Sequence, residues 1–249
     1  MAFAHHLPDH AADIAHRYGR AGNTAVQIKN DGSPVSAADQ EIEAALRRRI
    51  RERHPGDAIT GEEAGSHGQG PRRWIIDAID GTAAFLAGDS EWSTLIALED
   101  DGRIRWALPN QGAWSGPLPA RSSALGIWPP PTRLNHSQRI VAATLAARTA
   151  RTTPTLDWST ADPTAPLPKK PSTGSGTCHG ALLVATGRLD AFLLLGAGPW
   201  DIAALIPIVE EAGGVFSDLS GLRHIHTGAA LFSRPGLHDQ LLDIAGSAR

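Results

Sequence analysis

Two short apolar segments of the chain each lead directly into acidic residues. Residues 58–60 precede Glu62 and Glu63, and residues 74–79 contain Asp77 and end at Asp80. Short apolar runs bounded by turn signals are typical of buried strands. Strands so rich in isoleucine and tryptophan would not place this many acids there for solubility alone. We therefore expect two strands that deliver carboxylates to a functional site at their carboxyl ends.

Helical and strand patterns surround these two segments. Apolar residues at helical spacing predict an amphipathic helix over residues 8–20 and a second helix over residues 37–53, with Ser36 as the N-cap of the second. The buried stripe of the second helix is expected to consist of Ile42, Ala45, Leu46, Arg49 and Ile50. Further strands are expected at residues 93–98, 139–141, 191–195, 215–217 and 229–232. A further helix is expected to start at Gly81-Thr82, and others are expected at residues 178–186, 202–212 and 235–244.

This mixture of helices and strands predicts an α/β or α+β fold. We expect an N-terminal α+β lobe at residues 1–105 and a C-terminal α/β lobe at residues 106–249. Within the second lobe, residues 107–175 are rich in proline and tryptophan and give few secondary-structure signals.

Composition excludes several classes of protein. The chain of 249 residues has one cysteine, which cannot form an internal disulfide, and a formal net charge of −3, which gives no basic surface for nucleic acid. The longest apolar stretch, residues 181–197, contains Arg188 and Asp190 and is too polar to cross a membrane. The charged first 30 residues leave no apolar core for a secretory signal. We expect a cytoplasmic protein whose partners are neither nucleic acid nor membrane.

The acidic residues have the chemistry of a magnesium site. Mg²⁺ binds through a few carboxylates together with water and substrate phosphate. Asp77 and Asp80 could direct two carboxylates and the carbonyl of Ile79 to one point, and the backbone amides of Gly81 and Thr82, at a helix start, could hold a phosphate. Taken alone, Asp80-Gly81-Thr82 is more often a simple capped turn, so the tripeptide does not decide between the two interpretations.

The order of several motifs along the chain is more specific. Lys29 and the segments at residues 31–39, 61–63, 74–82 and 199–204 resemble the inositol monophosphatase family of Mg²⁺-dependent, lithium-sensitive phosphatases. The resemblance covers residues 10–103 and 174–233. It implies a layered α/β/α/β/α sandwich of the inositol monophosphatase and fructose-1,6-bisphosphatase type.

The resemblance also implies roles for individual residues. It assigns a first Mg²⁺ to Glu62, Asp77 and the Ile79 carbonyl, and a second to Asp77, Asp80 and Asp201, with two or three ions in all. Thr82, paired with Asp39, would activate the attacking water, and Glu62 would act with them in catalysis. Phosphate and substrate would be held at Gly81, Thr82 and Asp201. Glu63 either only supports the metal ligands or has a further role in the site.

Three segments, at residues 31–35, 92–98 and 203–214, are similar to the histidinol-phosphate phosphatases of this family. Other positions depart from the family pattern. Leu193-Leu194-Leu195 stands where relatives commonly carry an acidic residue that binds substrate hydroxyls or amines, Ala78 replaces a usual proline, and residues 107–175 lack a usual hairpin. These departures favour a specialised enzyme that serves a pathway other than histidine synthesis and has a larger or more apolar leaving group.

The expected partner is a small-molecule phosphate ester, with histidinol phosphate or a related biosynthetic intermediate as the first candidate. An inositol, sugar or nucleotide monophosphate is the alternative substrate class. A phosphatase-like binding protein without turnover is the alternative outside enzymes. The resemblance also implies a homodimer, since members of the family are commonly dimeric.

Overall fold

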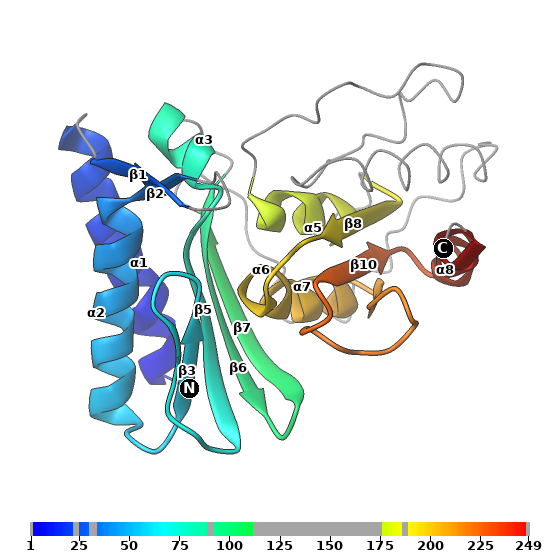
Figure 1. Ribbon diagram of the computed structural model, residues 1–249, viewed down its shortest axis with the longest axis horizontal. Helices are drawn as coiled ribbons and strands as arrows, with labels where there is room; N and C mark the ends of the chain where they lie inside the picture. The colour runs from blue at the N-terminus through cyan, green and yellow to red at the C-terminus, as the bar shows by residue number, and fades with distance from the viewer. Residues whose placement is uncertain are drawn as a thin grey trace. The chain divides into compact units, whose positions relative to one another are not determined.

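The computed structural model describes residues 2–21, 25–29, 34–88, 92–111, 176–185 and 189–247. These residues form two compact units. The first contains the described residues up to 111 together with 176–178 and 203–205, and the second contains 179–202 and 206–247. Both contain helices and strands (Figure 1), as the α+β prediction requires. The strand predicted at residues 139–141 and the motif residues 31–33 lie outside the described residues.

A five-stranded sheet forms the centre of the first unit, with the strand order β4-β3-β5-β6-β7. The strands are β3 (Ala58–Gly61), β4 (Gly65–His67), β5 (Arg72–Asp80), β6 (Ser93–Asp100) and β7 (Arg103–Gln111). β3 and β5 are parallel, and the other neighbours are antiparallel. A separate hairpin pairs β1 (Val26–Ile28) with β2 (Pro34–Ser36). Because β3 and β5 are parallel, the acidic residues that follow or end them lie at the same edge of the sheet.

Two helices cover one face of this sheet (Figure 1): α1 (Ala2–Ala21) and α2 (Ala37–Arg53). α1 begins six residues before the predicted start, and Pro8 lies inside it. α2 has the predicted bounds and the predicted Ser36 cap. Its buried stripe differs from the prediction, because Arg49 is exposed whereas Glu43 and Arg47 are buried. Glu43 and Arg47 form an ion pair, which makes their burial possible.

The second unit contains a three-stranded antiparallel sheet with the order β8-β10-β9. Its strands are β8 (Ala191–Leu195), β9 (Val215–Ser217) and β10 (Ala229–Ser233), and the helices of this part of the chain are α5 (Thr177–Ala185), α6 (Pro199–Ala203), α7 (Leu205–Glu211) and α8 (His238–Ser247). The helix predicted over residues 202–212 is divided at Ala204. Pro207 accounts for the break, since proline cannot donate the i to i−4 hydrogen bond that would reach Ala203. No helix among the described residues has both the length and the apolar character needed to cross a membrane.

A buried histidine connects α8 to the sheet of the second unit. The hydroxyl oxygens of Ser217 and Ser233 each lie 2.8 Å from a ring nitrogen of His238, and all three side chains are buried. The Ser217 hydroxyl also donates to the carbonyl of Asp218 at 2.7 Å. Burial lowers the pKa of His238, and this outweighs the opposing charge of Asp239.

We expect His238 to make the protein less stable in acid. The unfolded chain takes up the proton near the ordinary histidine pKa of 6.5, whereas the folded chain resists protonation to a lower pH. Well above pH 6.5 the residue is neutral in both states. As the pH falls from 6.5 toward the lower pKa of the folded state, each pH unit costs at most about 1.4 kcal/mol of unfolding free energy. Urea unfolding at pH 7.5 and 5.5 should therefore show a larger loss in the wild type than in His238→Gln. Equal losses in the two proteins would contradict this role.

Candidate functional site

The carboxyl ends of β3 and β5 place the predicted acidic residues of the first unit together. Gly61 is in register with Ile76, and the amide of Glu62 donates to the Ile76 carbonyl at 3.3 Å. Glu62 therefore begins the turn after β3 next to the point where Asp77 lies on β5. Both strands thus carry acidic residues at their carboxyl ends, as expected from the sequence, and the parallel pairing that brings these ends together is a finding of the structure.

An irregularity in β5 brings Asp77 and Asp80 to one side. In a regular strand, residues three apart point to opposite faces of the sheet. The pairing of β5 with β6 shifts register between Asp77 and Asp80, and such bulges redirect side chains. A carboxylate oxygen of each residue then lies within 4.8 Å of the other, and both residues are buried. Two buried carboxylates this close form a site suited to a cation.

Asp80 also caps a helix that is distant in sequence. The Oδ1 atom of Asp80 accepts from the Thr177 amide at 2.6 Å and from the Thr177 hydroxyl at 2.9 Å. The Oδ2 atom accepts from the Cys178 amide at 2.8 Å and from the Ser93 hydroxyl at 3.0 Å. Gly176 allows this approach, because a Cβ there would lie 2.6 Å from Asp80 Oδ2. Burial raises the pKa of Asp80, although these donors oppose the shift.

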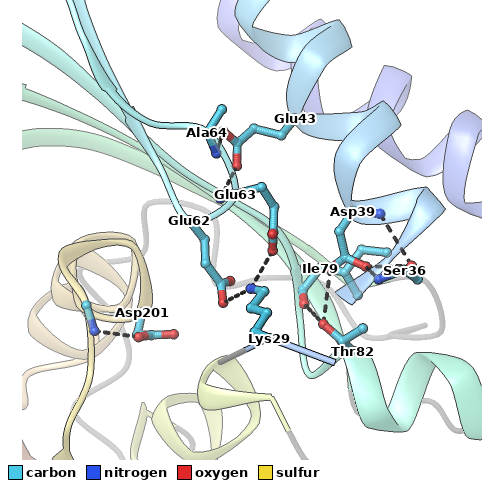
Figure 2. A network of polar contacts seen from close by, with 11 residues as sticks. Lys29, Ser36, Asp39, Glu43, Glu62, Glu63, Ala64, Ile79, Thr82 and Asp201 are labelled. Atoms are coloured by element: carbon cyan, nitrogen blue, oxygen red, sulfur yellow. Dashed lines mark hydrogen bonds and ion pairs between the residues drawn. The ribbon is translucent and has the colours of Figure 1, made fainter. Parts of the chain in front are cut away.

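The turn after β5 places Thr82 against Asp39. Gly81 has φ of +88°, in the left-handed region that glycine tolerates, and α3 (Thr82–Ala87) begins after it. The Thr82 hydroxyl lies 3.1 Å from both Asp39 Oδ1 and the Ile79 carbonyl (Figure 2). Asp39 is held in turn by Ser36, whose amide donates to Oδ2 at 2.8 Å. Burial raises the pKa of Asp39 despite the hydrogen bonds from Ser36 and Thr82.

Lys29 joins the two glutamates of the turn after β3. Its Nζ lies 2.7 Å from Oε1 of Glu62 and 2.7 Å from Oε1 of Glu63 (Figure 2). Burial lowers the pKa of Lys29, but the hydrogen bonds and charges of the two glutamates outweigh it and raise the pKa above its ordinary value. Burial raises the pKa of Glu62, and Lys29 opposes that shift. The motif resemblance includes Lys29 without a role, and no local signal in the sequence pairs it with the glutamates.

Asp201 belongs to the second unit. It lies in the first turn of α6, and its Oδ2 accepts from the amide of Gly198 at 2.6 Å (Figure 2). The other predicted metal ligands, at Glu62, Asp77, Ile79 and Asp80, belong to the first unit. Their donor atoms are carboxylate and carbonyl oxygens, which are the ligands that hard divalent cations prefer.

Comparison with known proteins gives a consistent result. The model of the inositol monophosphatase family matches residues 9–245. The chain is 33% identical over 266 residues to a histidinol-phosphatase of Streptomyces coelicolor, covering 97% of this chain and 95% of that protein. It is 30% identical over 215 residues to a fructose-1,6-bisphosphatase/inositol-1-monophosphatase of Thermotoga maritima, covering 84% and 81%. A solved IMPase structure from Thermotoga maritima has a TM-score of 0.70 and 22% identity, covering 99% of this chain and 96% of that one.

Proposed function

The chain belongs to the inositol monophosphatase family, and we propose that it is a Mg²⁺-dependent phosphatase acting on histidinol phosphate or a related amino-alcohol phosphate. Its family and its phosphatase relatives make it a phosphoric monoester hydrolase of small phosphate esters, in a family that is generally metal-dependent. The observation that carries the proposal is the Thr82–Asp39 hydrogen bond, which lies on the turn that directly follows the Asp77–Asp80 carboxylate pair.

The donor set of the first unit fits a hard divalent cation. Glu62, Asp77 and the Ile79 carbonyl would hold one Mg²⁺, and Asp77 and Asp80 would hold a second with Asp201. The assignment of Asp201 rests on the family resemblance and on its carboxylate chemistry. Bound Mg²⁺ would supply the Lewis acidity that lowers the pKa of the attacking water and stabilises the leaving alkoxide.

The protein's own groups would orient the reactants. The Thr82 hydroxyl, which donates to Asp39 in the structure, would accept a hydrogen bond from the attacking water and pass a proton toward the Asp39 carboxylate. Amides at the start of a helix lack partners within the helix, so those of Gly81 and Thr82 would hold the phosphate oxygens. No covalent intermediate with the protein is required.

The substrate proposal rests on similarity to a curated relative. The Streptomyces coelicolor relative is named a histidinol-phosphatase and is similar over 97% of this chain. The end of β8 offers only leucines, with Leu194 fully buried and Leu193 and Leu195 partly buried. This strand therefore offers no carboxylate to a substrate hydroxyl or amine, so it does not favour an amino-alcohol phosphate over a sugar or inositol phosphate.

A phosphate-release panel tests the substrate class. With Mg²⁺ present, we expect kcat/KM for histidinol phosphate to exceed that for inositol 1-phosphate, fructose 1,6-bisphosphate and AMP by about tenfold or more, the size of preference that a few differential contacts provide. A preference for inositol or sugar phosphate would contradict the proposed substrate and support the alternative class. Mg²⁺-dependent stabilisation without release from any compound would indicate a binding protein without turnover.

A further inference from the structure

A buried carboxylate on α2 binds the backbone of the turn that carries Glu62 and Glu63. The Glu43 side chain is 1% exposed. Its Oε2 accepts from the amide of Glu63 at 2.8 Å, and its Oε1 accepts from the amide of Ala64 at 3.0 Å (Figure 2). Arg47, one helical turn further along, donates from Nε to Oε1 at 2.7 Å and also hydrogen-bonds the carbonyl of Gly65. One ion pair thus holds three consecutive backbone positions after β3.

The end of β3 is shaped to receive this carboxylate. A Cβ on Gly61 would lie 2.5 Å from Glu43 Oε1, a separation that real Cβ atoms do not show. A side chain at position 61 would therefore displace the Glu43 carboxylate from this position. A buried ion pair is weak evidence for stability, since its desolvation cost can exceed its Coulombic gain. Its three hydrogen bonds to the backbone of one short turn indicate that it sets the conformation of that turn.

The same helix holds the Thr82 side of the site. Asp39 and Glu43 are four residues apart, so their side chains leave the same face of α2. Asp39 accepts from Thr82, and Glu43 accepts from the amide of Glu63. α2 is therefore hydrogen-bonded through Asp39 to the Thr82 hydroxyl and, one helical turn later, through Glu43 to the turn that follows β3.

We infer that Glu43 is a positioning residue that sets the Mg²⁺ affinity of the site through the backbone of the Glu62–Glu63 turn. The inference rests on the proposed function, because it assumes that Glu62 is a metal ligand. Groups that orient metal ligands typically change metal affinity by about 10- to 100-fold when they are lost. Glu43 would do so without contacting the metal or the substrate.

The test is Glu43→Gln, which keeps the shape but removes one acceptor. With the amide nitrogen in the Oε2 position, the N–H of Glu63 would face another donor. We expect the Mg²⁺ concentration for half-maximal thermal stabilisation, measured with Mg²⁺ alone, to rise about tenfold or more. The Mg²⁺ concentration for half-maximal phosphate release should rise equally, and kcat at saturating Mg²⁺ should stay within about threefold of wild type, since less than 1 kcal/mol of transition-state stabilisation is expected to change.

The matched control is Asp57→Asn. Asp57 is also a buried carboxylate that accepts three N–H hydrogen bonds, from Arg72 Nε and Nη2 and from Trp74 Nε1. It lies at the opposite end of the same parallel strand pair, before β3 and beside the start of β5. This variant should lower the unfolding free energy without changing the Mg²⁺ requirement.

An unchanged Mg²⁺ requirement in Glu43→Gln would overturn the inference and leave Glu43 a purely structural role. If that variant does not fold, Arg47→Lys decides, because it keeps the charge and removes the contact with Gly65. Arg47→Lys should also raise the Mg²⁺ concentration for half-maximal thermal stabilisation. A concentration equal to that of the wild type would overturn the inference. A wild-type chain that does not respond to Mg²⁺ would overturn the proposed function as well.

Discussion

Asp77→Asn is expected to reduce Mg²⁺-dependent phosphate release by about 10³-fold or more. Asp77 is proposed to bind both metal ions, and metal-ion charge stabilisation contributes several kcal/mol to such a transition state, with each 1.36 kcal/mol worth a factor of ten. Asparagine keeps the shape of the side chain but removes a full negative charge. Initial rates over a range of Mg²⁺ concentrations would measure the effect.

The stability of the same variant provides the control. Asp77 and Asp80 are buried, with carboxylate oxygens within 4.8 Å of one another, so removing one charge relieves repulsion in the absence of metal. Asp77→Asn should therefore unfold at or above the wild-type temperature without Mg²⁺ and gain little when Mg²⁺ is added. A variant with full activity, or one that is inactive only because it is unfolded, would not fit this account. Asp80→Ala is less informative, since it also removes the cap of α5.

Thr82→Val should lower kcat by about 10²- to 10⁴-fold, the usual range for a lost general acid–base contribution. Valine has the shape of threonine without the hydroxyl that lies 3.1 Å from Asp39 and 3.1 Å from the Ile79 carbonyl. The metal ligands remain, so the Mg²⁺ concentration for half-maximal thermal stabilisation should stay at the wild-type value. Steady-state kinetics and Mg²⁺ titrations of thermal unfolding would measure the two quantities.

Thr82→Ser supplies the matched control for this position. It restores the hydroxyl without the methyl group, and we expect it to recover most of the lost kcat. Equal losses in Thr82→Val and Thr82→Ser would show that packing around α3, rather than the hydroxyl, accounts for the effect. A large loss of Mg²⁺ affinity in Thr82→Val would argue against separate roles for Thr82 and the carboxylates.

Helices whose ends carry a local sequence signal, such as a capping residue, could be predicted from the sequence. Ser36 and Asp39 form the capping box that begins α2, and the predicted bounds of that helix are correct. Where no local pattern exists, the prediction was incomplete. β4 consists of three exposed residues without apolar alternation, and its position depends on pairing with β3. The division between α6 and α7 follows from Pro207, a signal that was present in the sequence but was not used.

The site shows the same division between local and distant causes. The acidic residues and Thr82 could be selected from short motifs. The register shift between Asp77 and Asp80 could not, because it depends on pairing with β6. The donors to Asp80 include Thr177, 97 residues away, and no spacing rule connects the two. Glu43 was missed because a charged residue in a charged helix is ordinarily exposed, and its partners lie in a turn 20 and 21 residues later.

The most direct test of the proposed metal site is a Mg²⁺ titration of thermal unfolding for the wild type and Asp77→Asn, without substrate. A ligand that binds only the folded state at about 100 times its Kd adds about 2.7 kcal/mol, which for a chain of this size raises the unfolding temperature by about 5–10 °C. The account predicts this rise in the wild type and its loss in Asp77→Asn. An unfolding temperature that does not respond to Mg²⁺ in the wild type, or that responds equally in the variant, would contradict a metal site built on these carboxylates.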